Sequence, residues 1–314
     1  MNKVIYILLS AILIISCNND DDSSNSNVPT ASQFNDLINN ARTAKTQTQS
    51  FSLSTGDIIN YTSPKGTKLR IEQNCLRKNG NAVTGSVTLK FLEVYDTADM
   101  ALTGVTTMGY NVNNQLQILK SGGAFEVAVY QDQVLLDVVC NYTLDVPYNL
   151  TGGFDSEMLQ WNGSLSQDNQ VEWTLNADAT IDRGLAASYM MILSDFGWFN
   201  IDRFYNDSRP LTAVSIKVPQ IYHAENSNMY FTLDEVPNSL GNMSTFTGST
   251  NSFNINQLPI GATIHFIFIT VHNGAYKMAI KSGTISSGAN FQIQDSDLQN
   301  ATESQLISHI NSIF

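Results

Sequence analysis

Residues 51–314 are expected to form an all-β protein of two β-sandwich-like domains, with a flexible N-terminal tether before them and a short C-terminal helix at the end. Short segments of alternating apolar and polar residues recur between clusters of Gly, Asn and Pro, a pattern typical of antiparallel strands with one buried face. Helical spacing of apolar residues is confined to one stretch before residue 50 and one stretch after residue 303. An apolar content of 42% is sufficient for a core.

The first sixteen residues predict a secretory signal peptide. Lys3 precedes an apolar run from Val4 to Ser16, which is shorter than the roughly 20 residues of a membrane-spanning helix. Ile14-Ile15-Ser16-Cys17 resembles the lipobox of bacterial lipoproteins. This resemblance implies that residues 1–16 are removed and that Cys17 is acylated, so that two or three acyl chains, at about 0.8 kcal/mol for each buried CH₂, fasten the protein to a lipid bilayer. The competing interpretation is an uncleaved anchor in which Cys17 has no role.

Residues 17–50 are expected to form a tether between the lipid and the folded body. The acidic segment Asn18–Asp22 must be solvated, because three adjacent carboxylates repel one another. It resembles the signal that sends lipoproteins of Bacteroidota to the outer face of the outer membrane, and the alternative is a plain hydrophilic linker. Part of the tether is a candidate helix behind a cap at Ser32, since apolar residues at helical spacing follow: Phe34, Leu37, Ile38 and Ala41.

Net charge and cysteine usage limit the partners. The chain carries 16 basic and 28 acidic residues, a net charge of −12, so phosphate backbones would repel it and we expect no nucleic-acid partner. Outside the inner membrane, Cys75 and Cys140 could form a disulfide whose loop of about 65 residues contributes roughly 4 kcal/mol; alternatively, each packs as a small apolar residue. The four scattered histidines have no metal-ligand spacing, so no metal or cofactor is expected.

The first sandwich is predicted to span residues 51–141. Val87, Leu89 and Phe91 share one face of a strand over residues 84–91, after a turn at residues 79–81. Further strands are expected at residues 57–62, 67–71, 115–119, 124–130 and 134–142.

Four blocks in this region resemble a domain of Bacteroidota surface lipoproteins, which is similar to the ZU-type β-sandwich of ankyrins and netrin receptors. The blocks are Gly66–Ile71, Asn79–Leu89, Glu93–Met100 and Leu119–Val127. The resemblance implies a sandwich that contacts other proteins and binds no cofactor. The chain departs from the pattern at residues 72–75, where a proline and an alanine are usual.

Residues 142–314 are predicted to form a second β-rich domain. The segment 262–271 is apolar on both faces, as in a central strand, and Asn273-Gly274 predicts a hairpin to a strand at residues 275–281. Apolar residues at helical spacing predict a helix over residues 304–314. This half resembles the C-terminal part of the same lipoproteins, which carry a Gly-Trp-Phe/Ile-Asn-x-Asp-Arg-Phe block like residues 197–204.

The densest chemical cluster lies between residues 198 and 207. Its aromatic side chains would stack on sugar rings and its polar side chains would bind hydroxyl groups or calcium. The candidate binding residues are Trp198, Phe199, Asp202, Tyr205, Asn206 and Asp207. The alternative is that the aromatic residues fill a seam between domains and that Asp202 pairs with Arg203 or Arg209.

Other motifs carry little chemistry. Asp155 with Glu157, and Asp234 with Glu235, are candidate glycosidase carboxylates only if their separation suits that reaction. Some relatives of the ZU-type family cleave themselves at His-Phe-Ser, but His265-Phe266-Ile267 lacks the hydroxyl group. Asp96-Thr97-Ala98 matches a three-residue O-glycosylation pattern of Bacteroidota.

We therefore predict a lipid-anchored outer-membrane protein that faces the cell exterior and acts as a non-catalytic binding module. Its expected partners are the lipid bilayer, through acylated Cys17, and a glycan or an outer-membrane protein. The alternative is an extracellular polysaccharide or peptide hydrolase whose acids lie in the second domain.

Overall fold

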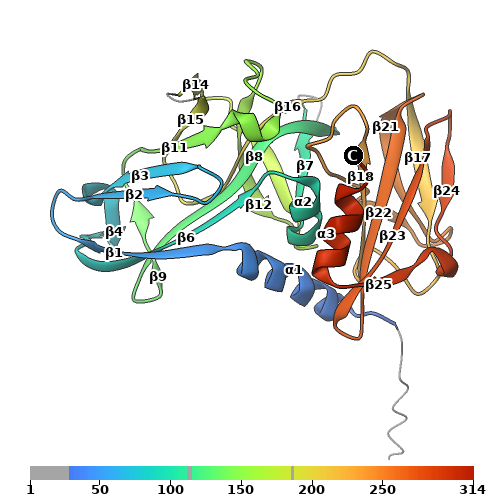
Figure 1. The fold of residues 1–314 in the computed structure, drawn as a ribbon, viewed down its shortest axis with the longest axis horizontal. Helices are drawn as coiled ribbons and strands as arrows, with labels where there is room; N and C mark the ends of the chain where they lie inside the picture. Colours follow the sequence, from blue (N-terminus) through green and yellow to red (C-terminus); the bar gives the residue numbers. More distant parts are fainter. Residues whose placement is uncertain (1–27, 112–114, 185–186) are drawn as a thin grey trace, which may run out of the picture.

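The computed structural model describes residues 28–111, 115–184 and 187–314, and its strands form two sandwich-like bodies joined by a layer of helices (Figure 1). The predicted all-β class with a short C-terminal helix is therefore confirmed. Cys17, the signal peptide and the acidic segment lie outside the described residues.

The first body contains one large sheet that packs against a smaller one. The large sheet has the order β1-β6-β8-β16-β12-β13-β7, with these bounds: β1 Gln47–Leu53, β6 Gly85–Val94, β8 Leu116–Gln131, β16 Gly197–Phe204, β12 Leu159–Leu165, β13 Val171–Leu175 and β7 Val105–Tyr110. A short strand β9 (Val134–Leu135) also pairs with β8. Because β7 pairs with the first residues of β8 as well as with β13, the strands β8, β16, β12, β13 and β7 form a closed circuit.

The smaller sheet packs on the face of β1, β6, β8 and β16 that is turned away from the helices. Its order is β14-β15-β11-β3-β2, with the bounds β14 Ile181–Arg183, β15 Ser188–Leu193, β11 Tyr142–Pro147, β3 Lys68–Glu72 and β2 Ile58–Thr62. Alternate residues of the two sheets form the first core, among them Leu89, Phe125, Leu144 and Tyr189, all fully buried. Three short strands, β10 (Asp137–Val138), β4 (Leu76–Lys78) and β5 (Asn81–Ala82), form a small separate sheet.

Cys75 and Cys140 are joined by a disulfide, with their Cα atoms 5.1 Å apart. Cys75 ends the short helix η1 (Gln73–Cys75), and Cys140 lies between β10 and β11. The bond therefore holds the small three-stranded sheet close to the start of β11.

The second body is a sandwich of two sheets. One has the order β20-β21-β17-β24 and the other β19-β18-β22-β23-β25. Their bounds are β20 Thr245–Thr247, β21 Ser252–Pro259, β17 Leu211–Lys217, β24 Asn290–Gln292, β19 Gly241–Asn242, β18 Ser227–Leu233, β22 Thr263–His272, β23 Ala275–Thr284 and β25 Gln299–Ala301. The predicted hairpin is present as β22 and β23, which pair over their whole length around Asn273-Gly274.

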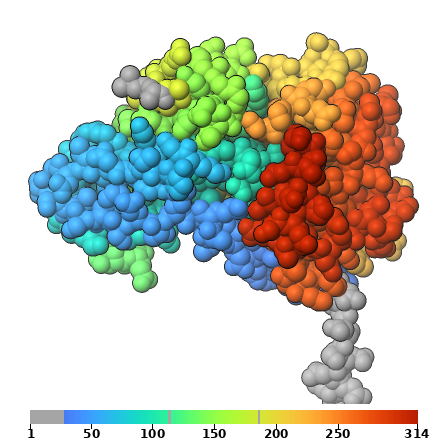
Figure 2. Space-filling model, viewed as in Figure 1, coloured from blue at the N-terminus to red at the C-terminus, as the bar shows by residue number. Residues whose placement is uncertain are grey.

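Three helices lie between the two bodies: α1 (Ala31–Lys45), α2 (Thr97–Thr103) and α3 (Glu303–Asn311) (Figures 1 and 2). Buried residues from all three helices, from the large sheet and from the outward face of β18, β22 and β23 form one continuous apolar cluster. Because this cluster spans both bodies, they pack as one molecule. No helix within the described residues is both long and apolar enough to cross a membrane.

The tether predicted at residues 17–50 is too long, because its residues from 31 onward lie in α1 and β1. Phe34, Ile38 and Ala41 are buried in the apolar cluster between the bodies, so α1 is part of the core. A capping box of Thr30 and Gln33 begins this helix, two residues earlier than the predicted cap at Ser32. The remainder of the segment up to residue 50 lies in β1.

The sheets do not divide the chain after residue 141, where the sequence predicts a boundary. Strands β11 to β16, from residues 142 to 204, pair with strands of the first body. The strands of the second body begin at β17. The segments predicted at residues 115–119 and 124–130 form a single strand, β8, whereas residues 134–142 are broken into β9, β10 and the first residue of β11.

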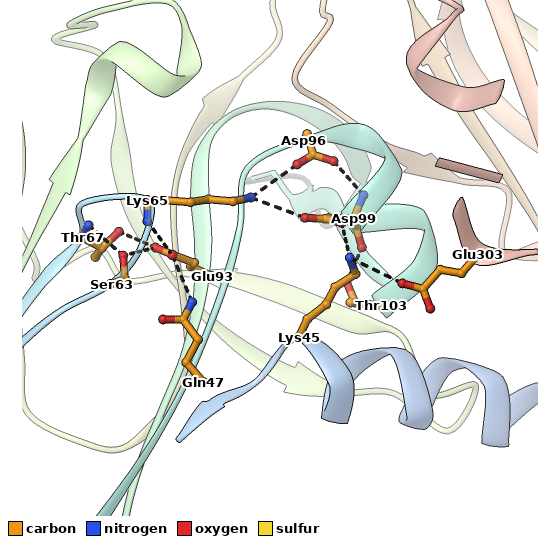
Figure 3. Close-up of polar contacts among 10 residues, drawn as sticks. All are labelled: Lys45, Gln47, Ser63, Lys65, Thr67, Glu93, Asp96, Asp99, Thr103 and Glu303. Carbon is orange, nitrogen blue, oxygen red and sulfur yellow. Dashed lines mark hydrogen bonds and ion pairs between the residues drawn. The ribbon is translucent and has the colours of Figure 1, made fainter. Parts of the chain in front are cut away.

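A polar network fixes the end of α1 against the first body (Figure 3). The Lys45 ammonium lies 2.5 Å from a carboxylate oxygen of Asp99 and 3.8 Å from Glu303. Although burial raises the pKa of Asp99, its hydrogen bond and charge interactions with Lys45, together with the charge of Lys65, outweigh burial and lower it. One lysine thereby connects the ends of all three helices.

The buried carboxylate of Glu93 continues this network toward β2 and β3. It accepts hydrogen bonds from Ser63 and Thr67, each 2.7 Å long, and from Gln47 at 3.1 Å (Figure 3). Since Gln47 is the first residue of β1 and directly follows the α1 cap at Thr46, the network sets where α1 lies relative to the large sheet.

Candidate binding groove

A groove of about 410 Å³ lies between α1 and the outer face of the large sheet. Its volume is within the range of about 300–1,000 Å³ that is usual for small-molecule sites. The lining residues come from five strands and one helix: Asn39, Arg42, Thr43, Thr46, Thr48, Lys90, Leu92, Glu126, Ala128, Tyr130, Leu165 and Trp198. Most of them carry a hydroxyl, amide or charged group, and the rest provide an apolar floor.

Strand register places the groove residues in two rows. Trp198 pairs with Glu126, and Glu126 pairs with Leu92 across β16, β8 and β6. The next row contains Ala128, Lys90 and Thr48, across β8, β6 and β1. Because successive side chains of a strand point to opposite faces, these rows are turned away from the first core.

Arg42 forms the wall of the groove next to α1. This residue is 8% exposed, and its guanidinium group donates hydrogen bonds to Thr103 O at 2.6 Å and to both the backbone and the side chain of Asn169 at 2.7 Å. Its guanidinium carbon lies 5.8 Å from the ring centre of Trp198, a cation–π contact. Burial lowers the pKa of Arg42, an effect that Tyr230 and Glu126 oppose, and the three hydrogen bonds hold the guanidinium group in place beside Trp198.

Glu126 is the one carboxylate among the groove residues. Desolvation by burial raises its pKa, although the positive charges of Arg42 and Lys90 act in the opposite direction. Among the described residues its carboxyl group makes no hydrogen bond and no ion pair within 4 Å. A half-buried acid without a partner and with a shifted pKa is a feature of functional sites.

Lys90 and Tyr130 form the open side of the groove. The Lys90 ammonium lies 5.1 Å from the ring centre of Tyr130. Lys90 is exposed and Tyr130 is half-buried, so a bound molecule can reach both. Together with Glu126, they place an acceptor, a donor and an aromatic ring around one space.

The residues predicted from the sequence lie in several places. Trp198 is at the floor of the groove and is 7% exposed, while Phe199 points to the opposite face of β16 and packs in the first core. Asp202 is fully buried on the same face as Trp161. The three cluster residues that lie in β16 are therefore divided between the two faces of this strand.

Tyr205, Asn206 and Asp207 follow the end of β16. Tyr205 and Asp207 line a second cavity, of about 220 Å³, where the two bodies meet, and Asn206 is exposed. The Tyr205 hydroxyl donates to Asp207 at 2.8 Å, and Arg209 forms an ion pair with Asp207 and another with Glu235 at 3.1 Å. The bond to Arg209 lowers the pKa of Asp207, which therefore acts as a fixed partner for Arg209.

Asp202 pairs neither with Arg203 nor with Arg209. It accepts a hydrogen bond of 2.6 Å from the Asn200 amide, while Arg203 binds Asp155 at 2.7 Å. Burial raises the pKa of Asp202 to about 7, although hydrogen bonding to Ser121, Asn200 and the Gly122 N–H acts to lower it.

The candidate O-glycosylation motif is packed against the second body. Thr97, the candidate O-glycosylation residue, is 3% exposed, and its hydroxyl donates to Pro237 O at 2.8 Å. This burial leaves no room for a glycan on that oxygen. No group of three or more metal-binding side chains is present in the part of the chain that the structure describes.

Arg42, Lys90, Glu126 and Tyr130 were not identified from the sequence. Lys90, Glu126 and Tyr130 each alternate with core residues along their strands. The two-residue period of a strand therefore indicates that their side chains point away from the core. Nothing local indicates that α1 crosses beside them, because α1 is far away in the sequence.

No protein-family model matches the chain, and no curated protein matches it.

Proposed function

We propose that the protein is a lipid-anchored outer-membrane module, facing the cell exterior, that binds a glycan in the groove between α1 and the large sheet and does not cleave it there. The observation that carries the proposal is the unpaired carboxyl group of Glu126 beside Lys90 and Tyr130 in a groove of about 410 Å³. A carboxylate accepts hydrogen bonds from neighbouring sugar hydroxyls, an ammonium donates to them, and an aromatic ring packs on the apolar face of a sugar.

The rest of the lining supports the same ligand class. Asn39, Thr43 and Thr48 add uncharged polar groups on exposed positions of α1 and β1, and Thr46, the half-buried cap of α1, adds a further hydroxyl group. Because Asn39, Thr48 and Lys90 are exposed, the groove is accessible from solvent, which suits a chain of sugars better than an enclosed small molecule.

The composition of the groove favours binding over glycoside hydrolysis. Hydrolysis of a glycosidic bond uses two carboxyl groups about 5–10 Å apart, and the groove residues include only Glu126. The acids proposed for a hydrolase are engaged elsewhere: Asp155 binds Arg203 and Lys120, and Glu235 binds Arg209.

Calorimetric titration of residues 28–314 with oligosaccharides from bacterial and host polysaccharides tests the proposal. We expect Lys90→Ala combined with Tyr130→Ala to lower affinity by roughly 10-fold or more, since each side chain contributes about 1 kcal/mol. Lys217→Ala, which removes an exposed lysine of the second body, is the matched control and should leave affinity unchanged. Equal affinity in the groove variant and the control would contradict the assignment, and capture of a stoichiometric protein that the groove variant still binds would favour a protein partner.

Glu126→Gln gives an independent reading of the same site. Because the pKa of Glu126 is raised, its carboxylate is lost as the pH falls through a range above that of an ordinary glutamate. Affinity of the unaltered protein should therefore decrease with acidification, and the variant should show a weaker but pH-independent affinity. An unchanged pH dependence in Glu126→Gln would exclude a direct contact with the ligand.

The membrane anchor is tested separately by mass spectrometry of the protein from cell membranes. We expect a first residue Cys17 with two or three acyl chains. A chain that begins at Met1 and carries no fatty acid would refute the lipid anchor without affecting the groove.

A further inference from the structure

Ser282, His265 and Asp234 form a chain of hydrogen bonds in the second body, far from the groove in sequence. The His265 Nδ1 atom lies 2.7 Å from the Ser282 hydroxyl oxygen, and its Nε2 atom lies 2.6 Å from a carboxylate oxygen of Asp234. A serine hydroxyl, an imidazole and a carboxylate joined in this order are the parts of a nucleophilic relay.

The strand register fixes these three residues side by side. His265 on β22 pairs directly with Ser282 on β23, and it pairs with Thr232 on β18 on its other side. Asp234 comes just after β18, where its N–H donates to Thr263 O at 3.3 Å. Because two of the residues lie in neighbouring strands and Asp234 directly follows a third strand of the same sheet, the arrangement does not depend on a long loop.

An open hollow of about 440 Å³ adjoins the hydroxyl group. Ser282 and His265 line it, together with Gln299, His309, Ser312, the apolar side chains of Ile280 and Ile313, and Asp297. The Asp297 carboxylate lies 3.8 Å from the Lys281 ammonium, which offsets its negative charge. The Ser282 side chain is exposed, whereas the His265 side chain is only 12% exposed. The nucleophile is therefore accessible while the base is held between its two partners.

We propose that Ser282, His265 and Asp234 hydrolyse short-chain O-acyl esters bound in this hollow. With the Nε2–H of His265 directed at Asp234, Nδ1 is free of a proton and accepts one from the Ser282 hydroxyl. The serine oxygen attacks the ester carbonyl, the C–O bond of the ester breaks, and the proton on His265 passes to the leaving alcohol. Water then attacks the acyl-serine, giving its proton to His265, and the acid leaves as the serine oxygen takes the proton back.

The hollow also contains groups that can stabilise the oxyanion. The Gln299 amide and a ring N–H of His309 are donors among its lining residues, and the Gln299 side chain has no hydrogen bond within the described residues. The C-terminal end of α3 lies at the same hollow, where backbone carbonyls rather than N–H groups are free. Stabilisation by side chains alone implies slow turnover of activated esters.

Labelling with a fluorophosphonate probe, followed by peptide mass spectrometry, tests the nucleophile. We expect the full chain to be labelled on Ser282, and Ser282→Ala to lose this label while keeping its melting temperature. The control Ser286→Ala removes an exposed serine from the following turn and should be labelled like the unaltered protein. Labelling that is absent, or that is the same in Ser282→Ala, would overturn the proposal.

Hydrolysis of p-nitrophenyl acetate tests the relay as a whole. We expect Ser282→Ala and His265→Gln to reduce the rate to that of the buffer, and Asp234→Asn, which alters only a positioning residue, to lower kcat roughly 10-fold or more with KM unchanged. If Ser282→Ala retains the rate, a surface imidazole is acting alone and the relay is refuted. Since no residue of the groove is altered, failure of this proposal leaves the glycan proposal standing.

Discussion

Replacing Asp202 by asparagine should stabilise the first body, and the gain should grow with pH. Asp202 is fully buried, and burial raises its pKa to about 7 from an ordinary value of 3.8. Between these values the folded protein holds a proton that the unfolded chain has lost, so stability falls as the pH rises. At about 1.4 kcal/mol for each pH unit, the loss is roughly 4 kcal/mol between pH 4 and pH 7, and above pH 7 the contribution is constant.

The hydrogen bonds around Asp202 agree with an uncharged side chain. Oδ2 accepts from the Asn200 amide, while Asp202 Oδ1 and Asn200 Oδ1 have no hydrogen-bond partner of ordinary geometry among the described residues. Both of these oxygens are acceptors when Asp202 is ionised. A proton on Asp202, or an amide in its place, supplies a donor at this position.

Urea unfolding of residues 28–314 at a series of pH values measures the effect. Tryptophan fluorescence reports on the correct region, because all three tryptophans are in the first body and the Trp161 indole donates to Asp202 O at 2.9 Å. The difference in unfolding free energy between Asp202→Asn and the unaltered protein should increase by about 4 kcal/mol from pH 4 to pH 7 and then remain level. Asp182→Asn, at an exposed position of β14, should give a small difference at every pH.

A pH-independent difference for Asp202→Asn would refute the reasoning. It would show that Asp202 ionises in the folded protein as it does in the unfolded chain, and therefore that its burial is compensated by water or by a bound cation. A loss of stability at every pH would instead show that the ionised carboxylate is the better partner for Asn200.

The remaining predictions concern packing and the disulfide. Gly163→Ala should destabilise the first body by about 1–3 kcal/mol, because a Cβ there would lie 2.6 Å from the Trp173 ring and 2.7 Å from the Cβ of Trp198; Gly248→Ala, with open space around it, is the control, and equal melting temperatures would contradict this packing. Reduction of the bond between Cys75 and Cys140, which are 65 residues apart, should lower the unfolding free energy by roughly 4 kcal/mol. An unchanged urea midpoint with reductant would show that this bond does not constrain the unfolded chain.

Local signals in the sequence predict the hairpin of the second body well. Asn273 has a φ of 51° and Gly274 a φ of 75°, the positive values that a two-residue hairpin turn requires. The strands on either side are long and pair residue by residue. All of the information needed for this element lies within about twenty consecutive residues, so sequence patterns are enough to find it.

Contacts between distant segments explain why the domain boundary could not be predicted. Phe199 of β16 pairs with Phe125 of β8, and no pattern near either residue specifies the other. The turn signals after Tyr142 are equally strong whether the next strand starts a new sheet or completes an old one. The surroundings of the candidate residues at 198–204 could not be predicted for the same reason, since their position in a central strand depends on β8 and β12.

The groove begins where α1 no longer covers the large sheet. The sequence of β6 indicates this point. On β6, Val94 and Leu92 face the helical layer and are buried, whereas Lys90 on the same face is exposed. One end of β6 is apolar on both faces, so both faces must be covered there. The other end is apolar on one face only, so its second face can remain open. The sequence of β6 does not identify the helix that covers it. It does indicate where the cover ends, and Lys90 and Glu126 line the groove at that point.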